Sequence, residues 1–173
     1  MTQRIRVERG DITTLAVDAV VTAANSALVG GGGVDGAIHR AAGPELLAAC
    51  RDIGGCPTGQ ARLTPGFGLR ARWCIHAVGP VWRGGTSGEA QALAAAWRAS
   101  LNLAAQQGCR SIAFPAISCG VYGYPIKQAC DISVVTVRAW LQAHEQPETV
   151  ILCAFDDAVA GFWQAALGSD TLR

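Results

Sequence analysis

The stretch "NSALVGGGGVDGAIHRAAG", Asn25 to Gly43, places four consecutive glycines directly before an apparent helix. Each glycine loses more conformational freedom on folding than any other residue does, so four in a row need a reason. Adjacent glycines let backbone N–H groups approach an anion closely, and the following helix adds its positive N-terminal end. The stretch therefore fits a phosphate cradle, although a flexible linker between a strand and a helix accounts for the glycines equally well.

Two well-known nucleotide motifs do not fit this stretch. Gly31, Gly33 and Gly36 satisfy the spacing GxGxxG, but the preceding strand ends several residues too early for a dinucleotide fold. The acidic residue at about the expected distance, Asp52, lies among helical residues. A P-loop is excluded because no Lys-Ser/Thr pair follows, and Lys127 is the only lysine of the chain.

Apolar periodicity on both sides of the glycine run predicts strands that alternate with helices. Strands are expected over residues 5–9, 18–23, 61–65, 72–78, 111–117 and 149–155. Helices are expected over 34–43, 44–52, 89–107 and 126–141, with a last one capped by Asp156 or Asp157. This order predicts a layered α/β domain. At 173 residues the chain is a single domain, 1–173, whose polar tail, 168–173, is expected to fray.

Composition and charge exclude several classes of function. Half of the residues are hydrophobic, but the apolar stretches fall short of the ~20 residues that a membrane span requires, so no membrane partner is expected. The N-terminus "MTQRIRVERG" has no apolar signal core, which predicts a cytoplasmic protein. A net charge of +1 without a basic run leaves no electrostatic footprint for nucleic acid, so direct DNA binding is not expected.

The cysteines and histidines predict neither a disulfide framework nor a metal site. Seven cysteines in a reducing compartment are expected to be free thiols. Cys50 and Cys56 are the closest pair, but no CxxC pair follows, and the histidines His39, His76 and His144 are scattered along the chain. We therefore expect no zinc site and no cofactor.

A second glycine-containing loop, "AISCGVYGYP" from Ala116 to Pro125, also lies between a buried strand and a helix. In α/β sheets such loops meet at the carboxyl ends of the strands, where ligands bind. Two phosphate-sized cradles at one edge of the sheet indicate a diphosphate ligand.

Six motifs together resemble the macrodomain family: "GDIT" (10–13), "AAN" (23–25), "GGGGVDGAIHRAAG" (30–43), "CPTG" (56–59), "IHAVGPVW" (75–82) and "FPAISCGVYGYP" (114–125). More narrowly they are similar to its MacroD-type branch, bacterial O-acetyl-ADP-ribose deacetylases that also remove single ADP-ribose groups from proteins. The resemblance implies a three-layer α/β/α sandwich around a mixed, mostly parallel sheet, with ADP-ribose on its crest.

The resemblance also assigns the adenine contacts. Asp11 would accept a hydrogen bond from the adenine amino group, which suits an acceptor-only carboxylate. The backbone of Ile12 would help to hold the ring, and Phe155 would stack on it. Without the family, Asp11 is a helix cap or turn residue, and Phe155 is an ordinary core phenylalanine.

The two glycine-containing loops would bind the diphosphate in this resemblance. Tyr122 would in addition pack against the distal ribose. The first loop contributes Gly32, Gly33 and Val34, and the second contributes Ser118, Cys119, Gly120, Val121 and Tyr122.

Asn25 and Asp35 are the expected catalytic residues. Asn25 can orient ribose hydroxyls without charge beside a dianionic diphosphate, and Asp35 can orient or deprotonate a water. Their alternative roles are an Asx turn that ends the strand and a partner for the helix dipole. Two residues depart from the family: Thr22 replaces a usual Asn, and Cys119 replaces a usual Thr. A thiol nucleophile at Cys119 is conceivable but has no histidine placed by sequence to support it.

The sequence therefore predicts a metal-independent hydrolase that acts on O-acetyl-ADP-ribose and on aspartyl or glutamyl ADP-ribose esters of mono-ADP-ribosylated proteins. One alternative is a reader that binds ADP-ribose without turning it over. Another is an interaction protein with an RNA-processing partner, as proposed for relatives of this type.

Overall fold

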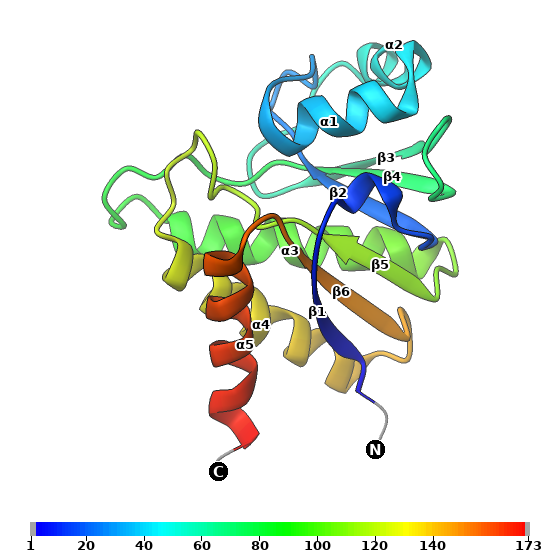
Figure 1. Cartoon of the computed structure of the whole chain (residues 1–173). Helices are drawn as coiled ribbons and strands as arrows, with labels where there is room; N and C mark the ends of the chain where they lie inside the picture. The colour runs from blue at the N-terminus through cyan, green and yellow to red at the C-terminus, as the bar shows by residue number, and fades with distance from the viewer. Residues whose placement is uncertain (1–2, 172–173) are drawn as a thin grey trace.

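The computed structural model describes residues 3–171, which form strands alternating with helices (Figure 1). The elements are β1 (Ile5–Arg9), η1 (Ile12–Thr14), β2 (Ala19–Ala23), α1 (Gly33–Ala42), α2 (Pro44–Ile53), β3 (Ala61–Pro65), β4 (Trp73–Ala77), α3 (Glu89–Gln106), β5 (Ser111–Phe114), α4 (Ile126–Ala143), β6 (Thr149–Ala154) and α5 (Asp157–Thr171). In this described part, no helix is both long enough and apolar enough to cross a bilayer.

Every strand and helix expected from the sequence is present, and the differences lie at the ends. Strand β5 ends at Phe114 instead of residue 117, because Pro115 has no backbone N–H to continue the ladder. Strand β6 ends at Ala154, so Phe155 lies beyond it. Asp156 caps α5, since its carboxylate accepts a hydrogen bond from the Val159 N–H at 3.0 Å.

Residues 168–171 of the predicted tail belong to α5, and fraying of this tail stays a prediction. The guanidinium of Arg138 on α4 donates to the carbonyl of Leu167 at 2.6 Å and to that of Ala166 at 3.4 Å. These bonds tie the last turns of α5 to its neighbour. Residues 172–173 lie outside the described residues.

The six strands form one mixed sheet in the order β1-β6-β5-β2-β4-β3. All neighbouring pairs are parallel except β3 with β4, which are antiparallel. This confirms the predicted mixed, mostly parallel sheet. Strands buried on both faces read as continuous apolar runs, as in "AVVTA" of β2.

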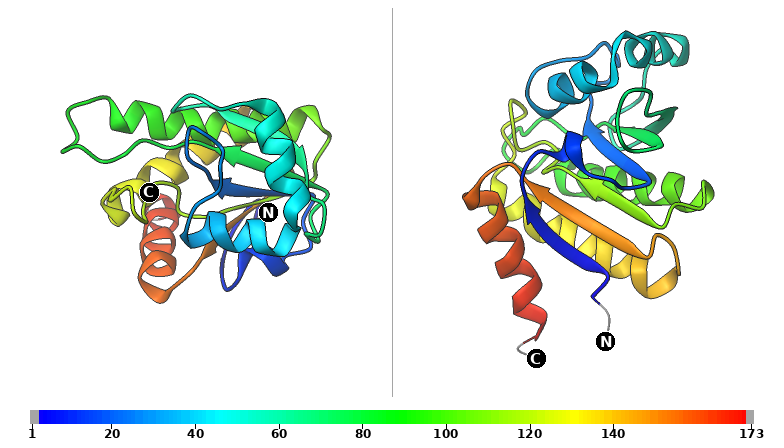
Figure 2. Two further views of the ribbon diagram at one scale, coloured as in Figure 1. Left: turned by 90° about the horizontal axis from the view of Figure 1, so that it is seen from above. Right: turned by 45° about the vertical axis from the view of Figure 1, so that its right-hand side comes forward.

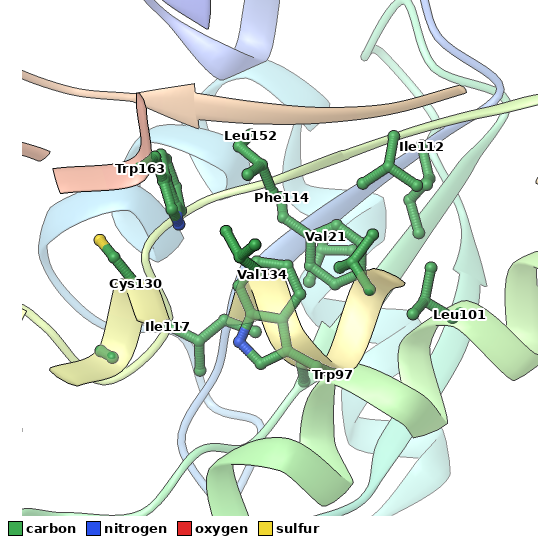
Figure 3. Close-up of a cluster of buried hydrophobic side chains, with 14 of the residues drawn as sticks. Val21, Trp97, Leu101, Ile112, Phe114, Ile117, Cys130, Val134, Leu152 and Trp163 are labelled. Atoms are coloured by element: carbon green, nitrogen blue, oxygen red, sulfur yellow. The ribbon is translucent and has the colours of Figure 1, made fainter. Parts of the chain in front are cut away.

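Helices cover both faces of the sheet, which confirms the three layers (Figures 1 and 2). Helices α3, α4 and α5 pack on one face, where Trp97 stacks on Phe114 with ring centroids 4.0 Å apart (Figure 3). Helices α1 and α2 and the short η1 pack on the other face, around Val20, Cys74 and Ile151. Successive residues of one strand thus point to opposite faces of the sheet and pack in two different hydrophobic cores.

The chain changes face at the centre of the sheet. After β2 the chain continues through α1 and α2 to β3 and β4. After β5 it continues through α4 to β6. Since β2 and β5 are neighbours, the loops that follow them part to opposite faces at this point. Such a switch point is where open α/β sheets bind ligands. Both glycine-containing loops lie here; in Figure 1 the loop after β5 is on the left, and the blue loop after β2 leads into α1 near the top.

The loop from β4 to α3 is held by one carboxylate, that of Glu89 in the first turn of α3. It accepts backbone N–H groups of Arg83 and Gly85 at 2.9 Å each and of Ser87 at 2.6 Å. The side chain is buried with the residue only 2% exposed. The bonds from Gly85 and Arg83 lower the pKa of Glu89 from 4.5 to about 2.

We expect Glu89→Gln to lower the melting temperature at neutral pH, because an amide replaces a charged acceptor of three N–H groups. Because the pKa of Glu89 is lower in the folded state, the ionised side chain stabilises the fold at pH values above the unfolded pKa. This stabilisation is lost as the pH falls through the folded pKa. The difference between wild type and variant should therefore shrink between pH 4.5 and about 2. Thermal melts over this range measure it. Glu45→Gln, an exposed residue in the first turn of α2, is the control and should change little.

Candidate functional site

Asp11 and Phe155 lie together at one end of the crest, the edge formed by the carboxyl ends of the strands. Arg9 pairs with Ala154 in the β1–β6 ladder, and the Gly10 N–H donates to the Ala154 carbonyl at 3.0 Å. Asp11 and Phe155 directly follow these paired segments. Residues 144 positions apart in the chain, by subtraction of their numbers, thus reach the same place.

Asp11 is an exposed carboxylate that caps η1. Its Oδ1 accepts the Thr13 N–H at 2.9 Å and the Thr13 hydroxyl at 2.7 Å, and these bonds lower its pKa. The capping alternative is therefore confirmed. Because the bonds to Thr13 use Oδ1, Oδ2 can accept from a donor outside the chain, so the cap and the predicted adenine contact are compatible.

Phe155 is 90% exposed, so the alternative of a core phenylalanine is wrong. The side chain follows the end of β6, where the chain turns toward α5, and offers an aromatic face to solvent. Ile12, the first residue of η1, is by contrast buried at 5% exposure and packs in the core on the α1 and α2 face of the sheet. Only its backbone can serve a ligand, as the family resemblance implies.

The second loop is closed by its own backbone. The Cys119 N–H donates to the Ala116 carbonyl at 3.2 Å, and the Tyr124 N–H donates to the Ser118 carbonyl at 3.0 Å. Ser118 has a φ of 69°, a left-handed conformation that is unusual for a residue with a side chain. Val121 at the tip is 100% exposed. The loop is thus a preset turn whose tip faces outward.

Cys119 and Tyr122 occupy the flanks of this loop. Burial raises the pKa of the Cys119 thiol to about 11, so the thiol stays protonated at neutral pH. This disfavours the thiol nucleophile. Tyr122 is half-buried, and its carbonyl accepts the Trp82 N–H at 2.8 Å, which joins the second loop to the loop after β4.

Gly79 in the loop after β4 packs directly against the second loop. A methyl group there would overlap Ser118 Oγ and lie 2.6 Å from Ile117 Cγ2. Glycine is therefore required for the close approach of the two loops.

We expect Gly79→Ala to displace the second loop and to weaken binding of a diphosphate ligand at least about tenfold, or about 1.4 kcal/mol. Calorimetric titration with ADP-ribose measures the loss, and a melt shows that the fold persists. Gly161→Ala is the control, because a methyl group at this exposed glycine of α5 meets nothing within 4 Å and Gly161 belongs to neither glycine-containing loop. Unaltered affinity in Gly79→Ala would show that the position of this loop does not matter for binding.

The glycine run owes its composition to both conformation and space. Gly33, the first residue of α1, has a φ of 57°, which favours glycine. The carbonyl of Gly31 lies so close to α1 that a methyl group at Gly36 would come within 2.6 Å of it. Gly31, Gly32 and Gly33 are exposed, and the first N–H groups of α1 have no partner within the helix. The run is therefore a shaped loop, as the cradle hypothesis predicts, with Val34 half-buried behind it.

Asn25 holds the start of this loop. Its Nδ2 donates to the Gly30 carbonyl at 2.9 Å, and its Oδ1 accepts the Val29 N–H at 3.2 Å. Asn25 thus spans the loop to residues 29 and 30, whereas the Asx turn proposed as an alternative would bond the backbone N–H two residues on. A methyl group at Gly31 would lie 3.8 Å from both Asn25 Nδ2 and Asp35 Oδ2, so these two side chains approach the loop from below.

Asp35 is a buried carboxylate, with its side chain 6% exposed. The Thr22 hydroxyl donates to Oδ1 at 2.7 Å, and His39 Nε2 lies 3.6 Å from the same oxygen. Burial raises the pKa of Asp35, while the Thr22 bond and His39 oppose that shift. Thr22 therefore supplies a direct hydrogen bond to the predicted catalytic carboxylate. The raised pKa makes Asp35 a better proton acceptor than an exposed aspartate.

Behind Asp35 the fold gathers polar residues that sequence reasoning left apart. Thr22 pairs with His76 in the β2–β4 ladder, and His76 Nδ1 lies 3.7 Å from the thiol of Cys50 on α2. The rings of His39 and His76 have centroids 6.4 Å apart. Two of the three histidines are thus close together in space. The positions of these histidines in the sequence do not indicate their proximity, because α1, α2 and β4 come together only in the folded structure.

Comparison with known proteins agrees with this geometry. The Macro domain family model matches residues 21–133. A Macro domain-containing protein of Chlorobaculum tepidum is 55% identical over 95% of this chain and 96% of its own length. An O-acetyl-ADP-ribose deacetylase of Citrobacter rodentium is 53% identical over 96% of this chain and 97% of its own.

Solved structures are similar over nearly the whole chain. A variant of the Oceanobacillus iheyensis macrodomain with ADP-ribose is 39% identical and has a TM-score of 0.92, covering 96% of this chain and 93% of that one. A Trypanosoma brucei macrodomain in complex with ADP-ribose is 41% identical with a TM-score of 0.89, covering 95% of this chain and 69% of that one.

Proposed function

The chain belongs to the macrodomain family, and on that premise we propose that it binds ADP-ribose along the crest and hydrolyses ester bonds on the distal ribose. O-acetyl-ADP-ribose and the aspartyl or glutamyl esters of mono-ADP-ribosylated proteins are the substrates of this class. The single observation that carries the hydrolytic part is the position of the Asp35 carboxylate under the glycine run beside Asn25: a methyl group at Gly31 would lie 3.8 Å from both Asp35 Oδ2 and Asn25 Nδ2.

The order of the sheet matches the order of groups in the ligand. The exposed Asp11 and Phe155 lie at the β1–β6 end, the second loop follows β5, and Asn25 with the glycine run follows β2. Since β6, β5 and β2 are successive neighbours, adenine, diphosphate and distal ribose can lie across them in that sequence. The backbone N–H groups of both loops then face the diphosphate, as an anion requires.

The chemistry assigned to Asp35 is proton transfer. In the proposed step a water oxygen bonds to the ester carbonyl carbon while the carboxylate takes the water proton. The bond from that carbon to the ribose oxygen then breaks, and the ribose oxygen receives the proton. The products are a ribose hydroxyl and a carboxylic acid, and Thr22 keeps the carboxylate in position through its hydrogen bond.

A reader that binds without turnover is the second candidate, and the burial of Asp35 favours it. A carboxylate with a 6% exposed side chain and a hydroxyl donor can also serve only to support the loop. Binding and turnover therefore need separate measurements. An RNA-processing partner remains a prediction from the family resemblance.

The adenine end is tested by Phe155→Ala. Stacking of a base on an aromatic ring contributes about 1–3 kcal/mol, so affinity for both ADP-ribose and AMP should fall roughly tenfold or more. Phe162→Ala on α5, where the side chain is 37% exposed, is the control and should bind normally. Calorimetry with both ligands decides it, and unchanged affinities in Phe155→Ala would remove Phe155 from the site.

The catalytic end is tested by Asp35→Asn, which keeps the shape and removes the base. We expect acetate release from O-acetyl-ADP-ribose to fall by ~10²-fold or more, with ADP-ribose affinity changed only a few-fold. Asp52→Asn, an exposed aspartate on α2, is the control and should retain full activity. A wild type that binds ADP-ribose but releases no acetate would make the protein a reader, and full activity in Asp35→Asn would assign the base elsewhere.

A further inference from the structure

The crest continues beyond the position proposed for the distal ribose. In the sheet, β2 has β5 on one side and β4 on the other, and β2 and β4 are parallel. The loops after these two strands therefore emerge at the same edge. Since adenine and diphosphate are assigned to β6 and β5, the ester on the distal ribose lies on the side of the loop that follows β4.

The connection from β4 to α3, residues 78–88, is held in shape by its own contacts, and we call it the β4–α3 loop. In Figure 1 it is the green segment that extends to the left of the molecule. Besides the three N–H groups that Glu89 accepts, the ring of Trp82 packs on that of Tyr124 with centroids 4.7 Å apart. A methyl group at Gly85 would lie 2.8 Å from the Trp82 ring. A partner that binds here meets a backbone that is already fixed, which lowers the entropy cost of binding.

Two exposed valines lie where the β4–α3 loop meets the second loop. The Trp82 N–H donates to the Tyr122 carbonyl at 2.8 Å, and the residues directly before these two are Val81 and Val121. Val81 is 41% exposed and Val121 is 100% exposed. Scattered apolar side chains on a surface need no explanation, but this pair lies on two joined backbone segments beside the proposed site. It offers an apolar contact to a group that extends from the distal ribose.

Arg83 adds a positive charge to the same loop. The residue is exposed, and within residues 3–171 its guanidinium has no hydrogen bond or ion pair. Glu89 accepts the Arg83 N–H at 2.9 Å, but its carboxylate is buried and occupied by backbone donors, so it does not pair with the guanidinium. A guanidinium binds a carboxylate through two parallel hydrogen bonds. The position of Arg83 therefore suits an acidic group of a partner.

The two proposed kinds of substrate differ in what extends beyond the ester. An acetyl group ends at its methyl, whereas the ester of an aspartyl or glutamyl residue carries polypeptide on both sides. That polypeptide needs a surface next to the distal ribose. Along the crest, the β4–α3 loop is the next segment after the glycine run.

We propose that Val81, Arg83 and Val121 form a docking surface for the polypeptide of a mono-ADP-ribosylated protein, an inference that rests on the proposed function. The two valines contact apolar atoms of the polypeptide, and Arg83 pairs with an acidic side chain near the modified residue. A basic side chain at the same place is repelled. The surface thus discriminates among protein substrates and is not used by O-acetyl-ADP-ribose.

The test uses two synthetic peptides that carry ADP-ribose through an amide in place of the ester, so that binding is measured without turnover. One has glutamates and the other has lysines on both sides of the modified residue. Calorimetry at low salt gives the affinity of each conjugate relative to that of free ADP-ribose. We expect the wild type to prefer the acidic conjugate by about threefold or more, the size of an exposed ion pair, and Arg83→Glu to reverse this order.

Arg98→Glu is the matched control, because Arg98 is an exposed arginine on α3 outside the β4–α3 loop, and this variant should keep the wild-type order. Equal affinities of the two conjugates in the wild type, or an unchanged order in Arg83→Glu, would overturn the docking surface although ADP-ribose still binds. An equal loss for free ADP-ribose and both conjugates in Arg83→Glu would also overturn it, since Arg83 would then belong to the nucleotide site. A wild type that does not bind free ADP-ribose would instead contradict the proposed function, and the docking surface with it.

Val81→Ser tests the apolar part of the surface. We expect it to weaken both conjugates about twofold or more relative to free ADP-ribose, because less apolar area is buried. Val135→Ser on α4, where the side chain is 68% exposed, is the control and should leave both conjugates unchanged. Melting curves of all variants show that the fold persists. Unchanged relative affinities in Val81→Ser would overturn the apolar contact.

Discussion

The candidate site depends on the parallel pairing of β2 with β5 on one side and β4 on the other. Parallel strands end at the same edge, so the loops after β2, β5 and β4 emerge together although their sequences are far apart. The chain then moves across the sheet in opposite directions, from β2 toward β4 and from β5 toward β6, which takes the following segments to opposite faces. The two glycine-containing loops therefore start from neighbouring strands at this point of the edge.

Close backbone approach is the second constraint. The carbonyl of Gly31 rests on Gly36 in the first turn of α1, and Gly79 rests on the side chains of Ile117 and Ser118. At Gly36 a Cβ atom would push the Gly31 backbone away, and at Gly79 it would displace the two side chains. The glycines that matter most for shape are therefore those under the loops, whereas Gly32 has open space around its Cα. An exposed glycine of this kind is free to face a ligand.

The polar side chains beneath the glycine run are buried and form specific contacts. Asp35 is held by the Thr22 hydroxyl, and His76 is held between Thr64 and Cys50. A buried carboxylate costs free energy unless it is bonded, so its retention there points to a use beyond packing. The proposed hydrolysis draws on this layer through the carboxylate of Asp35.

Much of the fold was predictable from local pattern. The apolar periodicity indicated the strands and α-helices of the described residues, and the errors lay at ends such as Phe114, where a proline stops β5. The glycine run and the motifs around Asn25, Asp35 and Ser118 indicated the candidate site, because each lies in a segment whose chemistry is carried by adjacent residues.

The sequence by itself thus determined the elements, the two glycine-containing loops and the family. Only the tertiary structure decided that Phe155 is exposed beside Asp11, that Asp35 is buried against Thr22, and that two histidines meet Cys50. The physical reason is that periodicity and turn chemistry act over a few residues, whereas these contacts depend on the order and register of strands. That order is set by packing of the whole sheet, which no local spacing records.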